Sequence, residues 1–134
     1  SVQWADDIQA LLGRTYSNLV DGGLLCFSTL GKGSFRELRK KFSSAGEKYP
    51  IPEYPDICEF RRFAAKFSSF ISEEKPRAVR HSSLVDFLRS LKNTGAVNPA
   101  VDMIRLSKLR KIMSEASDTP FECFYNIYNI LCVK

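Results

Sequence analysis

The sequence lacks several features that would assign it to a class at once. Its 134 residues include one histidine and one tryptophan. No apolar run approaches the roughly eighteen residues of a membrane-spanning helix, and its start has no signal-peptide anatomy. The four cysteines have neither the close pairs of a zinc site nor the density of a disulfide scaffold; they are Cys26, Cys58, Cys123 and Cys132. We therefore expect a cytoplasmic protein with buried, reduced thiols, no metal centre and no membrane contact.

What is present is typical of one α/β domain. Apolar residues make up 44% of the chain and charged residues 26%, with a formal net charge of +5. The predicted order is helix, strand, helix, helix, strand, helix, helix, strand, and there is no internal repeat. The predicted helices are one opened by Asp6 and Asp7, one capped by Ser34 with Glu37, one at 56–65, one after Ser82 or Ser83 and one at 107–115. The predicted strands are 24–29, 67–71 resuming within 73–80 around Pro76, and 121–133.

Residues 19–34 are the most informative stretch, because they place a glycine turn, an apolar strand and a glycine loop in succession. A strand that is apolar on both faces belongs inside a parallel sheet with helices above and below. Ligands of such sheets bind beyond the carboxyl ends of the strands. Only about twenty residues precede this strand, so we expect the chain to be the second half of an enzyme.

Three stretches carry a resemblance to class I methyltransferases that use S-adenosylmethionine. They are Ser1-Val2-Gln3-Trp4, the run from Leu19-Val20-Asp21-Gly22-Gly23 to Glu37-Leu38, and 84–97 with Arg89-Ser90-Leu91-Lys92 and Gly95-Ala96. The loop at 29–37 and the ending at 89–96 point to the malonyl-[acyl-carrier protein] O-methyltransferases of biotin synthesis. The resemblance implies a Rossmann-like sheet of which this chain holds the fifth to seventh strands. Residues 1–134 would then be the C-terminal part of one methyltransferase domain whose N-terminal donor-binding half is absent.

The resemblance also implies site residues. Val2, Gln3 and Trp4 would lie near the methyl donor, and Ser28, Thr29, Gly31 and Gly33 near the substrate. The alternative for Trp4 is that it packs against Ile8. The alternative for the residues near the substrate is that the glycines only form a tight turn between strand and helix. Arg77 and Arg80 are candidates for binding a malonyl carboxylate, since a guanidinium contacts a carboxylate at two points, or they are solvated charges. His81 has no partner at metal-ligand spacing. No catalytic residue is identified, and without the donor half we expect neither bound S-adenosylmethionine nor activity in this chain.

Basic residues suggest the partner. Arg36, Arg39, Lys40 and Lys41 follow the glycine loop, and they suit docking of an acidic acyl carrier protein, or form a solvated helix face. Nucleic acid is a weaker interpretation, because the aromatic residues have core spacing. A small-metabolite methyltransferase and a non-catalytic basic binding module are the alternative functions. The bare edge of the 24–29 strand predicts self-association or pairing with the missing half.

Overall fold

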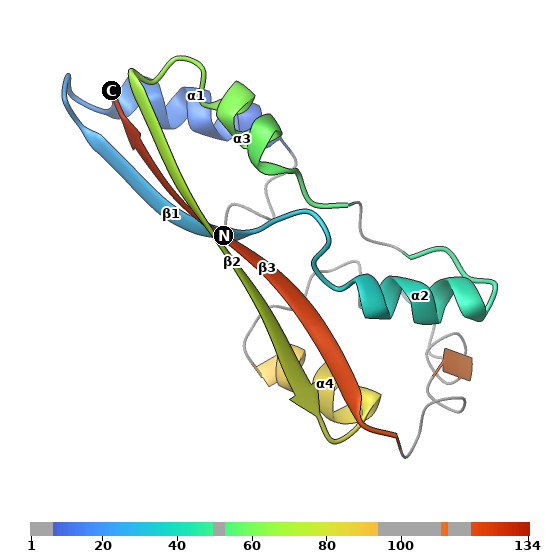
Figure 1. Ribbon diagram of the computed structural model, residues 1–134. Helices are drawn as coiled ribbons and strands as arrows, with labels where there is room; N and C mark the ends of the chain where they lie inside the picture. The colour runs from blue at the N-terminus through green and yellow to red at the C-terminus, as the bar shows by residue number, and fades with distance from the viewer. Residues whose placement is uncertain (1–6, 50–52, 94–110, 113–118) are drawn as a thin grey trace. The chain divides into compact units, whose positions relative to one another are not determined.

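The computed structural model describes residues 7–49, 53–93, 111–112 and 119–134 (Figure 1). Its elements are α1 (Ile8–Asn18), β1 (Leu24–Leu30), α2 (Arg36–Ser44), α3 (Ile57–Phe63), β2 (Ser69–His81), α4 (Leu84–Asn93) and β3 (Phe121–Val133). The chain divides into two compact units. The first comprises Ser1–Ser34, Glu53–Arg77 and Tyr125–Lys134, and the second Phe35–Pro52 and Ala78–Phe124. The α/β class predicted from the sequence is confirmed.

The sheet corrects the prediction of a parallel interior strand. Its order is β1-β3-β2, and β1 pairs antiparallel with β3, in a register that runs from Leu24 opposite Val133 to Leu30 opposite Ile127. Among the described strands, β1 lies at an edge, which agrees with the bare edge predicted for the 24–29 strand. Exposure alternates along it, with Leu24, Cys26 and Ser28 exposed and Thr29 buried. The apolar run hid this alternation, because Leu24 and Cys26 are apolar yet lie on the exposed face.

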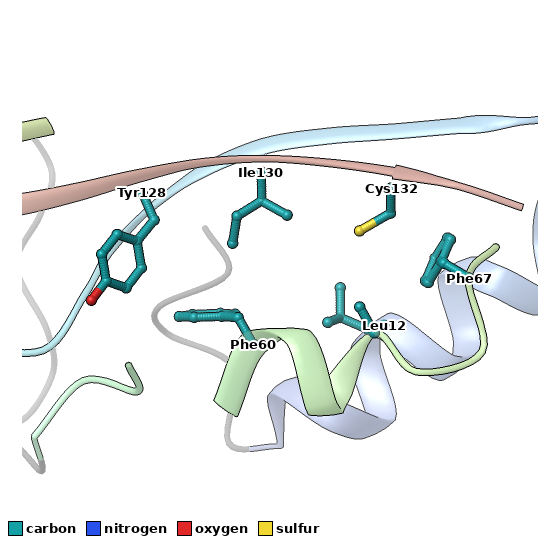
Figure 2. Close-up of a cluster of buried hydrophobic side chains, with 7 residues drawn as sticks. Leu12, Phe60, Phe67, Tyr128, Ile130 and Cys132 are labelled. Carbon is teal, nitrogen blue, oxygen red and sulfur yellow. The ribbon is translucent and has the colours of Figure 1, made fainter. Parts of the chain in front are cut away.

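The core of the first unit lies between one face of the sheet and the two helices α1 and α3. Figure 2 shows Tyr128, Ile130 and Cys132 pointing from β3 toward Leu12 of α1 and Phe60 of α3. Successive strand residues point to opposite faces, so the even-numbered positions of β3 from Asn126 to Cys132 form this buried row. Cys123 and Cys132 are buried as expected, whereas Cys26 and Cys58 are exposed, so the prediction of buried thiols is wrong for these two.

The helix starts were predicted with mixed success. Asp7 caps α1 by accepting a hydrogen bond from the Ala10 N–H at 2.8 Å. Asp56 and Glu59 form a complete capping box at α3, with both hydrogen bonds at 2.9 Å. The capping box predicted for Ser34 and Glu37 is absent: the residue before α2 is Phe35, in the left-handed region at φ 59°, and it provides no side-chain cap.

The second unit has its own aromatic core. Phe87 of α4 is fully buried, with its ring centroid 6.1 Å from that of Phe35 and 5.1 Å from that of Phe121. Leu38 and Phe42, predicted on the apolar side of α2, are buried. Ser83 caps α4 by accepting from the Asp86 N–H at 3.1 Å, which confirms one of the two predicted caps.

Strand β2 is longer than expected, because it continues through Pro76 without a break. It lies at the other edge of the described sheet, where a missing N–H is tolerated. Most of the helix predicted at 107–115 lies outside the described residues. None of the described helices combines the length and apolar character needed to cross a bilayer.

Candidate functional site at the carboxyl end of β1

The loop of residues 31–34 leaves the carboxyl end of β1 and packs closely against β3. The Gly31 N–H donates to the Asn126 carbonyl at 2.7 Å, and the Lys32 N–H donates to the Pro55 carbonyl at 3.1 Å. A Cβ at Gly31 would overlap the ring of Tyr128, so only glycine fits. Gly33 has φ 86°, a conformation that also favours glycine. Gly31 and Gly33, both predicted site residues, therefore shape this loop.

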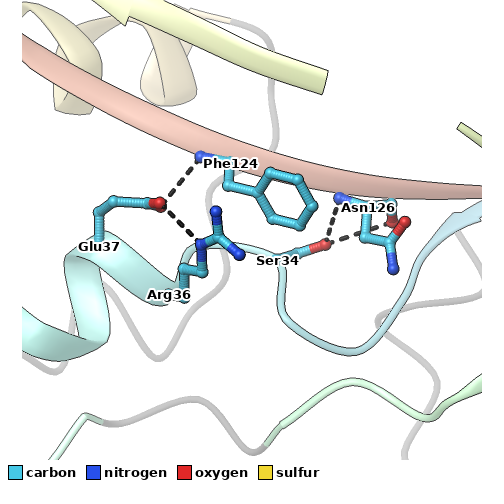
Figure 3. Close-up of polar contacts among 5 residues, drawn as sticks. All are labelled: Ser34, Arg36, Glu37, Phe124 and Asn126. Atoms are coloured by element: carbon cyan, nitrogen blue, oxygen red, sulfur yellow. Dashed lines mark hydrogen bonds and ion pairs between the residues drawn. The ribbon is translucent and has the colours of Figure 1, made fainter. Parts of the chain in front are cut away.

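Asn126 holds the same loop through its own polar groups. Its backbone N–H donates to Ser34 Oγ at 2.9 Å, as Figure 3 shows. Its side-chain nitrogen donates to the Lys32 carbonyl at 3.1 Å and to Glu74 Oε1 at 2.6 Å. The residue is only 7% exposed, and its Oδ1 has no hydrogen-bond partner. Buried polar groups are costly unless bonded, so these contacts fix the loop's path.

Tyr128 completes this cluster. Burial, and then the nearby carboxylates of Glu74 and Asp56, raise the pKa of its phenol above 10.0. It is therefore protonated at neutral pH and cannot serve as a general base. Its ring packs edge-on against Phe60, with centroids 6.0 Å apart. The phenol supports the loop and provides no basic oxygen.

The other predicted substrate residues lie on different sides of the strands. Ser28 is exposed, and its Oγ donates to Asn129 Oδ1 at 2.7 Å. Thr29 is buried next to it. Arg77 and Arg80 are both exposed on β2, and neither has a partner among the described residues. Because strand side chains alternate, two residues three apart point to opposite faces, so the two arginines cannot bind one carboxylate together.

In the second unit, Glu37 is held at the start of α2. One carboxylate oxygen accepts from the Phe124 N–H at 2.9 Å, and the other lies 3.0 Å from Arg36 Nε (Figure 3). Partial burial raises the pKa of Glu37, but the hydrogen bond from Phe124 and the Arg36 guanidinium outweigh it and leave the pKa below its usual 4.5. Glu37 thus anchors α2 to β3 in place of the predicted capping box.

The basic residues of α2 differ in how they are held. The Arg36 guanidinium lies 4.1 Å from the centroid of the Phe124 ring, and that of Arg39 lies 4.5 Å from the Tyr49 ring. Lys40 is exposed and Lys41 half-buried. Cationic groups over aromatic rings keep their charge while losing rotational freedom. The helix therefore combines two positioned arginines with an exposed lysine.

Val2, Gln3 and Trp4, which the resemblance predicts near the methyl donor, lie outside the described residues. Within the described ranges, no three His, Cys, Asp or Glu side chains gather as metal ligands would. Sequence reasoning missed Asn126 and Glu74. Asn126 could have been noticed as a polar residue within the otherwise apolar, aromatic strand 121–133, where a buried amide must find partners.

The chain is similar in sequence to several curated proteins. It is 34% identical over 100 residues to the malonyl-[acyl-carrier protein] O-methyltransferase of Magnetococcus marinus, a match that covers 75% of this chain and 37% of the relative. It is 31% identical over 117 residues to the biotin biosynthesis bifunctional protein BioCD of Bordetella avium, covering 86% of this chain and 24% of the relative. It is 30% identical to malonyl-[acyl-carrier protein] O-methyltransferase 1 of Coxiella burnetii, covering 77% of this chain and 36% of the relative.

No family model matches the chain. The predicted resemblance to malonyl-[acyl-carrier protein] O-methyltransferases is nevertheless confirmed, because relatives with that name match about three-quarters of this chain. The chain spans between 24% and 37% of the length of these three relatives.

Proposed function

We propose that this chain forms the substrate side of a methyltransferase domain that transfers a methyl group from S-adenosylmethionine to the free carboxylate of malonyl-[acyl-carrier protein]. The observation that carries the proposal is the match of about three-quarters of the chain to relatives named for this reaction. The closed glycine loop at the carboxyl end of β1 supports it, since ligands of α/β sheets gather at that end. The assignment of β1, β2 and β3 as the fifth to seventh strands of the domain is part of the proposal.

The reaction needs positioning more than it needs a base. The donor, when bound, supplies a methyl carbon on a positively charged sulfur. A malonyl carboxylate is already ionised, so its oxygen would accept that methyl group as the carbon–sulfur bond breaks, and the residues of this chain would need to supply no base. This agrees with a loop whose polar groups are used for shape: Tyr128 stays protonated, and Glu74 accepts a hydrogen bond from Asn126. Catalysis would then come from orienting the carboxylate.

Arg77 is the better candidate for binding that carboxylate. It lies four residues after Glu73 in β2, so both point to the same face of the strand, the face where Ser28 and Asn129 lie. Arg80 points to the opposite face. We therefore assign the carboxylate to Arg77 alone, on the strand face that carries Ser28, opposite the face on which Asn126 and Glu74 hold the loop of residues 31–34.

The carrier protein would dock on α2. Carrier proteins are acidic, and a basic helix attracts them during encounter. Arg36 and Arg39 are held against aromatic rings, and Lys40 is exposed beside them. This surface is proposed to bind the protein part of the substrate, separately from the carboxylate that Arg77 binds.

A chimera tests the proposal. The part of the Magnetococcus marinus relative that precedes its matched residues is joined to this chain, and radiolabelled methyl transfer to malonyl-[acyl-carrier protein] is measured. We expect the chimera to be active and this chain alone to be inactive. A chimera that binds S-adenosylmethionine but methylates no malonyl thioester would refute the function. Equal activity on small carboxylic acids would instead support a small-metabolite methyltransferase.

A matched pair of variants tests the site. Arg77→Gln in the chimera should raise the KM for malonyl-[acyl-carrier protein] at least tenfold, because a charged two-point contact is lost. Arg80→Gln removes the same charge three residues away on the opposite strand face and should change KM less than twofold. Equal effects of the two substitutions would contradict the assignment of Arg77.

A further inference from the structure

Three successive residues around the start of α2 are held by one residue of β3, Phe124, within the second unit. The Phe35 N–H donates to the Phe124 carbonyl at 2.8 Å, and the Phe124 N–H donates to Glu37 Oε2 at 2.9 Å. The Phe124 ring lies against the Arg36 guanidinium, with 4.1 Å between the guanidinium carbon and the ring centroid (Figure 3). These contacts fix the place of the Arg36 side chain.

The backbone directly before Arg36 adopts an unfavourable conformation. Phe35 has φ 59°, in the left-handed region that residues with a side chain rarely adopt. Such a conformation persists where the surrounding structure holds it, and it is found mostly at binding and catalytic sites. Phe35 is buried, with its ring centroid 6.1 Å from that of Phe87. The packing of Phe35 therefore adds to the contacts that orient Arg36.

The guanidinium of Arg36 has one occupied edge and one open edge. Its Nε lies 3.0 Å from Glu37 Oε1, and its flat face lies against the Phe124 ring. Within the part of the chain that the structure describes, its terminal nitrogens Nη1 and Nη2 have no hydrogen-bond partner, and 58% of the side chain is exposed. The N–H groups of these two nitrogens are therefore presented to solvent from a fixed position.

A guanidinium presented in this way is suited to an oxyanion with two free oxygens. Its N–H groups match the two oxygens of a carboxylate or a phosphate in one plane, which the ammonium group of lysine cannot do. A side chain that is already ordered loses less conformational entropy on binding. The local charge also favours an anion, because α2 carries four cationic side chains and one carboxylate. That carboxylate, Glu37, occupies only the Nε edge and leaves the open edge available.

Arg62 of α3, in the first unit, has partners of the same two kinds, but they hold it less closely. Its Nη2 lies 3.8 Å from Glu59 Oε1, and its guanidinium carbon lies 5.8 Å from the centroid of the Phe63 ring. The carboxylate thus lies next to one of the two nitrogens that would bind an anion. Arg62 therefore provides a matched control: it has the same chemistry as Arg36 without the same orientation.

We propose that Arg36 is an oxyanion-binding residue, which binds a carboxylate or a phosphate ester of the carrier-bound substrate through Nη1 and Nη2. The identity of the partner rests on the proposed function. The inference adds a two-point contact at one residue to the general attraction of an acidic protein by α2. It also makes Phe124 and Glu37 positioning residues for that contact, while the malonyl carboxylate stays assigned to Arg77.

Inorganic phosphate is the first probe of the site, because it needs no carrier protein. The Nε–H signal of Arg36 is followed by nitrogen-15 NMR of this chain and identified by its loss in Arg36→Lys. We expect this signal to shift and to saturate as phosphate is added, and to stay in place in chloride of equal ionic strength. An equal phosphate shift of the Arg62 signal, or a shift that does not saturate, would overturn the site.

Substitutions that keep every charge test the two-point contact. Arg36→Lys should raise the Kd of unacylated acyl carrier protein for this chain by about fivefold or more, because the ammonium group makes no two-point contact. Arg62→Lys should raise it less than twofold. Phe124→Leu keeps the charges and the backbone hydrogen bonds but removes the ring, and it should raise the Kd about twofold to threefold. If Arg36→Lys leaves the Kd unchanged, or weakens binding no more than Arg62→Lys does, the basic residues act only as charges and the proposal is wrong.

Two forms of the carrier protein identify the source of the oxyanion. An equal loss for Arg36→Lys with and without the phosphate-bearing prosthetic arm would assign a side-chain carboxylate of the carrier protein. A loss only when the arm is present would assign the phosphate ester. Either result supports the site. Saturable phosphate binding at Arg36, together with a chimera that methylates no malonyl thioester, would keep the site and refute only the proposed function.

Discussion

The two compact units use polar side chains differently. In the first, the buried side chain of Asn126 donates to the Lys32 carbonyl of the loop, and the buried hydroxyl of Ser34 bonds to the backbone of Asn126 in β3. In the second, Arg36 and Arg39 lie over aromatic rings of the same unit and carry charge along α2. A buried amide fixes geometry because its alternative is an unpaired polar group. A cation over a ring keeps its charge for a partner. The first unit is thus suited to shape a site, and the second to attract a partner.

Gly31→Ala should produce the largest loss of unfolding free energy, and it tests whether close packing fixes the loop of the first unit. The new methyl group would overlap the ring of Tyr128, which is fixed between Phe60 and the loop. Overpacking of this kind costs about 3 kcal/mol of unfolding free energy, measured as a shift of the urea midpoint. Gly13→Ala is the matched control. Nothing lies near its Cβ position within α1, so it should stabilise the chain by about 0.5–1 kcal/mol.

Ser34→Asp tests whether Ser34 anchors the loop to β3, as the structure shows, or caps α2, as the sequence predicted. Aspartate is as good an N-cap as serine, so a true cap would tolerate the change. Ser34 Oγ is instead buried between the N–H and carbonyl of Asn126, and a carboxylate there should cost about 2 kcal/mol. Asp56→Ser, at the genuine capping box of α3, should cost less than about 0.5 kcal/mol. Similar urea midpoints for the two variants would contradict this distinction.

Much of the fold could be predicted from local patterns. The final strand was predicted with the bounds that the structure has, since 121–133 is rich in aromatic and β-branched residues. The cap at Asp56 was found because its spacing to Glu59 is a local signal. Ser34 and Glu37 have the same spacing, yet each bonds to β3, about ninety residues away in sequence. A local pattern cannot show that a distant strand competes for the same side chains.

The site was less accessible to prediction for the same reason. Glycines 31 and 33 could be placed in a loop at the end of a strand, but the ring that makes Gly31 obligatory belongs to Tyr128. Leu24 and Cys26 look like core residues from composition alone. Their exposure depends on which face of the sheet the helices cover, and that is decided by the antiparallel pairing with β3.

Glu37→Gln tests how the second unit holds α2. The folded-state pKa of Glu37 lies below its usual 4.5, so the charged carboxylate stabilises the fold above that pH. This contribution is lost as the pH falls through the lowered folded-state pKa. The variant should therefore lose about 1 kcal/mol of unfolding free energy at pH 7 and much less at pH 3. Glu122→Gln, on an exposed position of β3, should change stability by less than about 0.5 kcal/mol at either pH. A penalty for Glu37→Gln that does not shrink in acid would exclude the charge as its cause.

Lys40→Gln should have the smallest effect on stability, and it tests whether α2 of the second unit attracts the partner. Lys40 is exposed on α2, so its loss should change the unfolding free energy by less than about 0.5 kcal/mol. Association of an acidic acyl carrier protein should nevertheless slow by about twofold to threefold at low salt, because a surface charge acts mainly on the rate of encounter. Lys66→Gln removes an equal, exposed charge from the first unit and serves as the control. If surface charge attracts the partner without regard to place, the two variants will slow association equally. If α2 is the docking surface, only Lys40→Gln will slow it, and added salt will remove the difference because it screens the attraction.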